Sequence, residues 1–382
     1  MIELGVDEIT LVLQLPAEAK SILESKKWKE VAEDIRLQFE MESEIRTVLG
    51  KVKIGRKAPE GYTTVYEYGD HAFYFAVAYH EYRPDMGVIV KFSAQALDYY
   101  LEEVDLKLYE FLQNIEQENY SQRLSRIDLT ADYIDEDIDI SEIYQTLMDS
   151  KVALFREQKN KKTGKMEFRK VIMKYEGFLK GNEVQTLYVG SPKSNSRLRI
   201  YDKKREQIER KGSKLQKALG CENWTRFEAV MRNEYAHQLS AELMNITTDN
   251  EFANLIALTI SQKYRFMEVD NGVAGNPTEY TQMLLDCISN NMFKLRTSSA
   301  RNYELTRNII YIFSGSGVMN TLYKLKAIWG IDAVVGLMEY ILDRLENGFA
   351  PNDDCRYWLN NNLNDYKKQY PDFDTYMHQN IS

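Results

Sequence analysis

The order of hydrophobic and polar residues predicts a strand at the start of the chain. Apolar and polar residues alternate over Val6–Leu15, and a proline closes the segment. Residues 17–40 follow with a nearly helical spacing of apolar positions, which predicts a helix. Three aromatic and β-branched runs within residues 62–92 then predict an antiparallel meander, and a helix is expected over about 94–118.

The middle of the chain is predicted to mix strands with short helices. A strand at Ser125–Ile134 runs into an acidic turn at 135–139, which we interpret as a solvated loop and cap before a helix from Ser141. The later elements are expected in this order: strands over 153–190 with a hairpin tip at 160–165, a strand at 197–202, a charged helix at 203–218, a strand at 224–232, and helices to about residue 268.

The stretch AspAsnGlyValAlaGlyAsnProThr, residues 270–278, is the strongest candidate for a domain boundary. Beyond it the pattern is helical, and the apolar residues between Ile331 and Leu345 form a helical stripe. The sequence therefore predicts an α+β fold. An antiparallel sheet with helices packed on one face is expected over residues 1–268, and a helical C-terminal domain over 279–382.

Composition is that of an ordinary globular protein, with 44% hydrophobic and 28% charged residues. The three cysteines lie far apart, which favours free thiols in a reducing cytoplasm over a disulfide or zinc framework. No apolar run reaches 18 residues, and the start lacks the basic and apolar regions of a signal peptide. We therefore expect a cytoplasmic protein with no membrane partner.

The charge of the chain is unevenly distributed. The net charge is −9, but residues 156–217 contain 19 Lys and Arg against 7 Asp and Glu, a local balance of +12 that leaves −21 for the rest. A basic segment in an acidic protein is typical of a polyanion site, although a solvated basic surface would look the same. The candidate DNA-binding residues are Lys161, Lys162, Lys165, Lys193 and Arg197.

Three predicted strands combine an apolar face with a polar face. Because successive side chains in a strand point to opposite sides, each of these strands has its charged residues on one face. The polar sets are Arg126, Asp128, Thr130 and Asp132; Arg197, Arg199, Tyr201 and Lys203; and Arg226, Glu228, Val230 and Arg232. Any one strand could simply be exposed to solvent. If the three strands pair, however, Asp128, Asp132 and Glu228 can converge as an oxygen site for Mg²⁺ or Mn²⁺.

Tyr201 has a chemical use beside such a site. A phenol has an ordinary pKa of about 10 and attacks poorly at neutral pH. The flanking cations Arg199 and Lys203 are expected to favour the phenolate. A metal ion would polarise a phosphodiester, and attack by the tyrosine would leave a covalent phosphotyrosine. Since the chain has 26 tyrosines, local chemistry alone does not single out this one.

Several motifs together resemble the Rep_trans family, which comprises rolling-circle replication initiators of small Gram-positive plasmids and relaxases of integrative conjugative elements. The run TLYVGSPKSNSRLRIYDKKRE (186–206) is similar to the family's TLYIGS…S…RIYDK signature. RIDLTADYID (126–135) is similar to its R-x-D-x-x-x-D strand, and RFEAVMR (226–232) to its R-x-E strand. VDEITLVL and GVIVKFSAQALDYY (87–100) look like its early elements. The resemblance covers about residues 5–265, with the motifs in the family's order.

The resemblance implies a metal-dependent enzyme that nicks and rejoins one DNA strand at an origin through a 5′-phosphotyrosine. It implies that Tyr201 is the nucleophile, that Asp128 and Glu228 bind the metal with Asp132 as a less certain third ligand, and that Arg199 and Lys203 contact the phosphate. Origin DNA is the expected partner, and a host DNA helicase and a second copy of the chain are further candidates. The relaxases that bind metal through paired histidines fit less well, because the four histidines include no His-x-His pair.

Two alternatives remain. A DNA-binding protein that keeps the fold without the chemistry would show binding and no cleavage. Within the nicking enzymes, plasmid initiator and conjugative relaxase share their chemistry, and the long helical tail slightly favours a relaxase. A tyrosine recombinase is disfavoured because its catalytic domain is helical, whereas the tyrosine here lies in a predicted strand.

Overall fold

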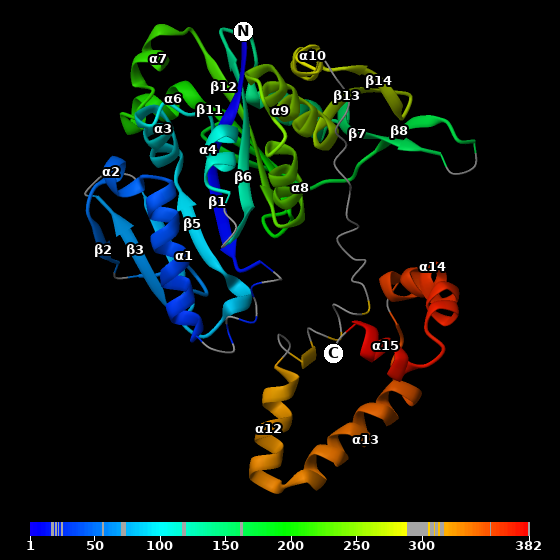
Figure 1. Cartoon of the computed structure of the whole chain (residues 1–382). Helices are drawn as coiled ribbons and strands as arrows, with labels where there is room; N and C mark the ends of the chain where they lie inside the picture. Colours follow the sequence, from blue (N-terminus) through cyan, green and yellow to red (C-terminus); the bar gives the residue numbers. More distant parts are fainter. Residues whose placement is uncertain are drawn as a thin grey trace. The chain divides into compact units, whose positions relative to one another are not determined.

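The computed structural model describes the chain except for residues 17–18, 20, 22, 24–25, 56, 70–73, 117–119, 161–162, 289–304, 306–308, 310–311, 314–316, 352 and 381–382. The chain divides into two compact units, Met1–Leu295 and Arg296–Ser382 (Figure 1).

The first unit is built on a ten-stranded sheet in which neighbouring strands are antiparallel. Its strand order is β2-β3-β4-β5-β1-β6-β12-β11-β10-β9. The strands are β1 (Ile2–Gln14), β2 (Val52–Ile54), β3 (Thr64–Tyr68), β4 (Phe75–Tyr79), β5 (Val88–Phe92), β6 (Ser121–Ile134), β9 (Tyr175–Lys180), β10 (Glu183–Val189), β11 (Ser196–Asp202) and β12 (Trp224–Arg232). The predicted meander and the three predicted polar strands are all present in this sheet.

A smaller sheet has the order β14-β13-β7-β8. It consists of β7 (Val152–Lys159), β8 (Met166–Lys170), β13 (Arg265–Asp270) and β14 (Val273–Pro277). Strands β7 and β8 form the predicted hairpin around residues 160–165, which extends away from the body of the unit (Figure 1).

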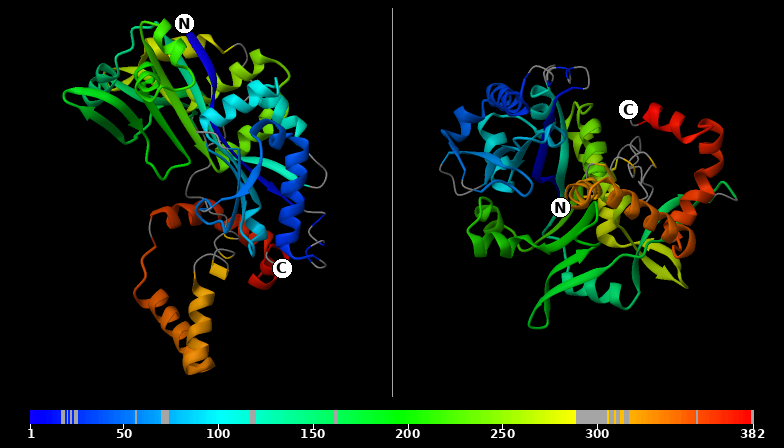
Figure 2. Two further views of the ribbon diagram at one scale, coloured as in Figure 1. Left: turned by 90° about the vertical axis from the view of Figure 1, so that its left-hand side faces the viewer. Right: turned by 90° about the horizontal axis from the view of Figure 1, so that it is seen from below.

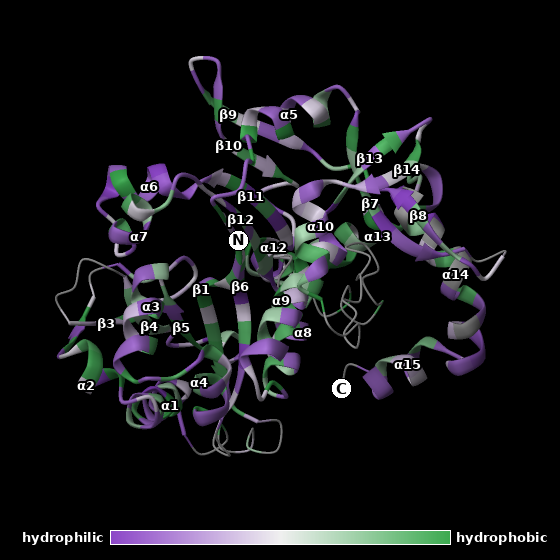
Figure 3. Ribbon diagram, turned by 90° about the horizontal axis from the view of Figure 1, so that it is seen from above, coloured by the Kyte–Doolittle hydropathy of each residue, from purple (hydrophilic) through white to green (hydrophobic). Residues whose placement is uncertain are grey.

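Alternation along the strands gives the large sheet one apolar face, visible as bands of colour along β6 and β12 (Figure 3). Apolar residues of β1, β6, β11 and β12 join a single core with the helices that cover this face. Those helices are α1 (Trp28–Glu42), α2 (Ile45–Leu49), α3 (Ala94–Glu103), α4 (Leu108–Asn114), α5 (Ile140–Met148), α8 (Glu234–Leu243), α9 (Asp249–Lys263) and α10 (Glu279–Asp286) (Figure 2). The predicted fold class, an antiparallel sheet with helices packed on one face, is confirmed.

Two short helices lie on the other face. Helices α6 (Lys203–Arg210) and α7 (Leu215–Gly220) follow the strand that contains Tyr201. Ala218 of α7 packs with Ile134 and Trp224, which belong to the polar side of β6 and β12. These helices therefore border the polar face at one end.

Two predicted helices are each broken in two by residues with left-handed backbone. The helix expected over 94–118 forms α3 and α4, because Asp105 between them has φ 52°. The helix expected over 203–218 forms α6 and α7, because Lys211 has φ 49°. A left-handed residue cannot continue a right-handed helix.

The predicted helices are present but end before residue 268, and the predicted boundary at 270–278 lies in a β-hairpin. Helix α9 ends at Lys263, and β13 pairs with β14. Asn271 and Gly272 join the two strands with φ values of 49° and 82°. An Asn-Gly pair with two positive φ values is the preferred two-residue hairpin turn. The segment lies within the first compact unit, and the assignment of nicking to residues 1–268 stays a prediction.

The described part of the second unit is helical, as predicted. It contains α12 (Val318–Trp329), α13 (Ile331–Asn347), α14 (Asp353–Gln369) and α15 (Phe373–Asn380). The predicted apolar stripe lies on α13. The rings of Tyr366, Tyr370 and Tyr376 pack together between α14 and α15, in two tilted pairs and one T-shaped pair, and hold these two helices together.

Candidate active site

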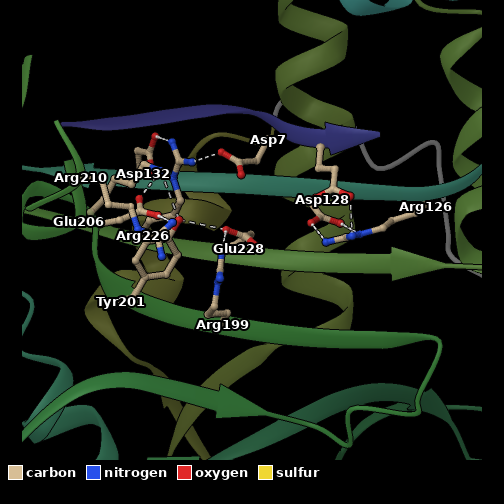
Figure 4. Close-up of polar contacts among 12 residues, drawn as sticks. Asp7, Arg126, Asp128, Asp132, Arg199, Tyr201, Glu206, Arg210, Arg226 and Glu228 are labelled. Atoms are coloured by element: carbon tan, nitrogen blue, oxygen red, sulfur yellow. Dashed lines mark hydrogen bonds and ion pairs between the residues drawn. The ribbon is translucent and has the colours of Figure 1, made fainter. Parts of the chain in front are cut away.

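The three polar strands are adjacent in the sheet, and their register aligns the charged residues in rows. Asp132 pairs with Arg226, which pairs with Tyr201. In the next row Thr130 pairs with Glu228, which pairs with Arg199. In the third row Asp128 and Arg197 lie on either side of Val230. The strands therefore form one polar face, in which Glu228 lies between the tyrosine row and the Asp128 row (Figure 4).

Tyr201 is buried on this face, with 6% of its surface exposed. Its hydroxyl donates to Glu228 Oε2 at 3.0 Å, and Arg199 donates to the same oxygen at 2.5 Å. The Arg199 guanidinium lies over the phenol ring, 4.5 Å from its centre. A tyrosine and an arginine thus share one carboxylate oxygen.

The strand that contains Tyr201 turns directly into a helix. Asp202 ends β11, and its carboxylate accepts from the backbone N–H of Arg205 at 2.8 Å, which caps α6. Lys203 is therefore the first residue of α6. The alternation had placed it in the strand, and that placement was wrong. Its Nζ still lies 3.5 Å from the Tyr201 hydroxyl, and it also pairs with Glu206 at 2.6 Å.

The ionisation of Tyr201 differs from the sequence-based expectation. Burial raises the pKa of Tyr201 well above its usual value, and the nearby negative charge of Glu228 raises it further. Arg226 and Arg199 oppose this shift without overcoming it. Arg199 thus favours the phenolate, as expected, but burial and Glu228 outweigh it. The phenol hydroxyl donates its hydrogen bond to Glu228.

The central strand β1 adds two acids that sequence reasoning missed. The pairing of β1 with β6 shifts register between Val6 and Ile9, a β-bulge that contains Asp7 and Glu8. Asp7 accepts from Arg226, and Glu8 accepts from Arg126 at 2.6 Å. Two consecutive acids in an otherwise alternating strand were the only available signal.

Asp132 is fastened to an arginine at the end of the face where Tyr201 lies. Arg226 donates to both of its oxygens, at 2.6 and 2.7 Å, and the same guanidinium reaches Asp7. Burial opposes ionisation of Asp7, but Arg226 lowers its pKa below the usual value. Because the register places the Thr130–Glu228 row between Asp132 and Asp128, the expected convergence of Asp128, Asp132 and Glu228 does not occur.

Asp128 lies at the other end with 1% of its surface exposed. Arg126 donates to both of its oxygens, at 2.9 and 2.6 Å. Burial raises the pKa of Asp128 to about 7, and the negative charges of Glu228 and Glu8 contribute in the same direction against Arg126. Burial also raises the pKa of Glu8, again with a contribution from Glu228. Glu8, Asp128 and Glu228 therefore repel one another.

Carboxylates that repel one another are suited to a hard divalent cation, which takes oxygen ligands. By donor chemistry, Glu8, Asp128 and Glu228 fit such an ion. Their present contacts are with arginines, and among the described residues no three His, Cys, Asp or Glu side chains are arranged as a finished metal site.

A cleft of about 350 Å³ opens beside Tyr201. Its walls come from β9, β10, β11 and α6, and include Phe178, Tyr188, Arg199, Arg205 and Arg210. The nucleophile candidate therefore borders a space large enough for a small ligand.

The structure separates the predicted DNA-binding residues. Arg197 lies on the polar face, pairs with Glu176 at 2.8 Å and stacks on Tyr188. Lys193 is exposed in the loop before β11, and Lys165 is exposed on the β7–β8 hairpin of the smaller sheet. Lys161 and Lys162 lie outside the described residues. The role of all five residues in DNA binding stays a prediction.

The fold and the site define an α+β protein whose sheet has a face of arginines, carboxylates and one buried tyrosine. Residues 122–341, more than half of the chain, match the family model for replication initiation factors, Rep_trans. The chain belongs to this family, as its motifs indicated, and this membership supports a role in the initiation of DNA replication and hence DNA as a partner.

Among solved structures the chain is similar to a rolling-circle replication initiator protein from Geobacillus stearothermophilus. The two are 16% identical with a TM-score of 0.48, over 78% of this chain and 100% of that chain. No curated protein sequence matches the chain. In the part of the chain that the structure describes, no helix has the length and hydrophobicity needed to cross a bilayer.

Proposed function

We propose that the chain nicks and rejoins one DNA strand at an origin, with Tyr201 as the nucleophile. The observation that supports this most directly is the hydrogen bond from the Tyr201 hydroxyl to Glu228 beside an open cleft. Family membership supplies the role in replication, and the polar face supplies the chemistry.

The raised pKa of Tyr201 decides how the attack proceeds. A protonated phenol needs a base that removes its proton as the new bond forms. Glu228 already accepts this proton at 3.0 Å. The tyrosine oxygen bonds to phosphorus, and the bond from phosphorus to the 3′ oxygen breaks. The 3′ oxygen takes up a proton from solvent, which balances the proton that Glu228 removes from the phenol. The products are a 5′-phosphotyrosine and a free 3′ hydroxyl, and the reverse reaction rejoins the strand.

Two cations are placed to stabilise the phosphate as charge develops on it. Arg199 lies against the phenol ring, and Lys203 Nζ lies 3.5 Å from its hydroxyl. Preorganised cations in a buried site stabilise a transition state more than they would in water.

Glu8, Asp128 and Glu228 are the residues that would hold a divalent cation, Mg²⁺ or Mn²⁺. When bound, the ion would neutralise charge on the scissile phosphate. Arg126 must release Asp128 for this ligand to become available, since it occupies both oxygens. Asp132, proposed from the sequence as a third ligand, is the least accessible candidate because Arg226 holds it.

The test is covalent capture on supercoiled DNA that contains the origin, with Mg²⁺ or Mn²⁺. Wild type should give an SDS-resistant complex, and peptide mapping should place the adduct on Tyr201. Tyr201→Phe keeps the ring but removes the attacking oxygen, so it should bind DNA and form neither nick nor adduct. Tyr188→Phe is the matched control, because Tyr188 lines the same cleft. Undiminished nicking by Tyr201→Phe, or an adduct on Tyr188, would overturn the assignment. Binding without cleavage by wild type would favour the non-catalytic alternative.

The same chemistry would serve conjugative transfer, and the helical second unit is the feature that favours this second candidate. A nick exposes a 3′ end but does not separate the strands, so either process needs a helicase from the host or its element. A homodimer would bring a second tyrosine to the origin. Loss of replication, or of transfer, of an origin-bearing plasmid in cells with Tyr201→Phe distinguishes the two roles.

A further inference from the structure

The polar face continues beyond Tyr201 to the free edge of the sheet. In the register, Tyr201 pairs with Thr186 of β10, which pairs with Phe178 of β9. In the neighbouring row, Arg199 pairs with Tyr188. Strand β9 is the last in the sheet. Two aromatic side chains therefore lie on the same face as the nucleophile, between it and the sheet edge.

These aromatic residues line the cleft beside Tyr201 and do not form part of the core. Phe178 has 62% of its surface exposed. Its neighbour Leu179, which has 50% of its surface exposed, belongs to the opposite face, since it lies beside Gly177 and Gly177 faces Tyr144 of α5. Phe178 therefore lies on the face with the cleft, whereas the exposed Leu179 does not. Because Phe178 and Tyr188 both line the cleft, a ligand in the cleft can contact their rings.

Tyr188 is already part of a stack. The Arg197 guanidinium lies over its ring, 4.1 Å from the centre, and a bond to Glu176 at 2.8 Å holds the guanidinium in place. Aromatic rings and arginine planes are the groups on which unpaired bases stack. The two aromatic residues, fixed on a rigid sheet, form such a surface.

The opposite wall of the cleft supplies cations for a phosphate. Arg205 and Arg210 of α6 line it. They pair with Glu209 at 2.8 Å and with Glu206 at 3.2 Å, both on α6. Each pair has one exposed partner, Glu209 or Arg210, and ion pairs near the surface contribute little free energy, so a phosphodiester can compete for these arginines.

We propose that this cleft binds a nucleotide of single-stranded DNA that flanks the scissile phosphate, with its base stacked on Phe178 against Tyr188. The position of the nucleotide next to the cut rests on the proposed function of Tyr201, whereas the stacking itself does not. A base in a duplex has no free face for an aromatic ring, so the cleft selects unpaired DNA. Phe178 is then a binding residue of the nicking site.

The probe is a short single-stranded oligothymidylate that contains one 2-aminopurine, whose fluorescence falls when it stacks. Wild type should bind it and quench it. Phe178→Ala should weaken binding about tenfold, the effect typical of one lost base stack, and should reduce the quenching. Phe178→Trp should restore both. Leu179→Ala is the matched control and should behave as wild type, because it alters the adjacent exposed residue on the other face.

Equal affinity and equal quenching in Phe178→Ala and wild type would overturn the proposal. So would a loss of the same size in Leu179→Ala. Tyr201→Phe should still quench the probe. If wild type forms a covalent adduct but Phe178→Ala binds normally, the stacking fails while the nicking stands. If no adduct forms but quenching depends on Phe178, the nicking fails while the stacking stands.

Discussion

Glu228 interacts with both ends of the polar face. One of its oxygens accepts from both Tyr201 and Arg199, and its charge raises the pKa of Tyr201 and of Asp128. Neutralising this carboxylate would remove the proton acceptor of Tyr201 and one proposed ligand of the divalent cation. The proposed roles of the two ends are therefore coupled at one side chain.

Removal of the metal is the first prediction. EDTA should abolish nicking, and Mg²⁺ or Mn²⁺ should restore it. Asp128→Ala and Glu228→Ala should each lower the nicking rate about 10²- to 10³-fold, the loss typical of a group that stabilises developing charge. Circular dichroism should show an intact fold in both variants. Full activity of both variants in EDTA would show that the carboxylates do not act through a metal.

At the scale of elements, the bulge in β1 determines how the face is charged. Without it, alternation would place Asp7 and Glu8 on opposite faces. With it, Glu8 meets Arg126 of the neighbouring strand β6, and Asp7 meets Arg226 of β12, one strand further on. The bulge thus links the central strand to both ends of the site.

The second prediction is that Arg226→Met destabilises the first unit. Arg226 has 2% of its surface exposed and bonds to Asp7 and Asp132. Leaving the buried Asp132 and the partly buried Asp7 without this partner should lower the free energy of unfolding by about 3–5 kcal/mol. Urea denaturation measures this change. Arg232→Met is a control, because Arg232 donates only to a backbone carbonyl at an exposed site.

The loss of stability in Arg226→Met should depend on pH. Arg226 holds the pKa of Asp7 below its usual value of 3.8. A lowered pKa stabilises the fold above the unfolded value, and this contribution is lost as pH falls through the folded value. The difference between wild type and Arg226→Met should therefore be largest near neutral pH and narrow below about pH 4. A difference that stays constant with pH would contradict the ion-pair explanation.

Much of the arrangement of the strands was predictable from the sequence, because the alternation of residues in a strand determines the face on which each side chain lies. The polar sets on β6, β11 and β12 could be predicted from the two-residue period of a strand alone, and the pairing of the strands brought the sets together. Asp7 and Glu8 were missed because a bulge depends on the partner strand. The expectation that Asp132 converges with Asp128 and Glu228 was wrong, because the register of the strands, and not the alternation within each strand, determines which residues lie in the same row. The direction of the shift in the pKa of Tyr201 was missed because flanking charges are visible in a sequence, whereas burial and the proximity of Glu228 are not.

At the scale of the whole molecule, the basic segment is distributed over both sheets of the first unit. Arg197 and Arg199 belong to the polar face, whereas Lys165 lies on the β7–β8 hairpin. The whole chain has a net charge of −9, which favours solubility but opposes approach to DNA. DNA affinity should then depend on a few local cations and strongly on salt.

The third prediction concerns that salt dependence. Neutralising Lys161, Lys162 and Lys165 to Gln should weaken DNA binding with little change in sequence preference. The slope of log affinity against log salt should become shallower by about one for each lost phosphate contact. Fluorescence anisotropy at several salt concentrations measures the slope. Lys26→Gln with Lys29→Gln is the control, because these lysines pair with Asp34 and Glu81. An unchanged slope in the triple variant would place the DNA path elsewhere.

The position of β1 affects how the protein is made. This strand lies in the middle of the large sheet, between β5 and β6, although it is the first to be synthesised. Its contact with β6 spans long stretches of chain: the Ser125 hydroxyl donates to the carbonyl of Thr10, 115 residues earlier. On the ribosome, β1 can pair with β5 early, but its other edge stays open until β6 emerges. Sheets with such distant pairings fold slowly and expose strand edges meanwhile. The acids of β1 must wait for arginines that are synthesised later, Arg126 on β6 and Arg226 on β12. A nascent chain that is compact over β1–β5 therefore has no assembled polar face.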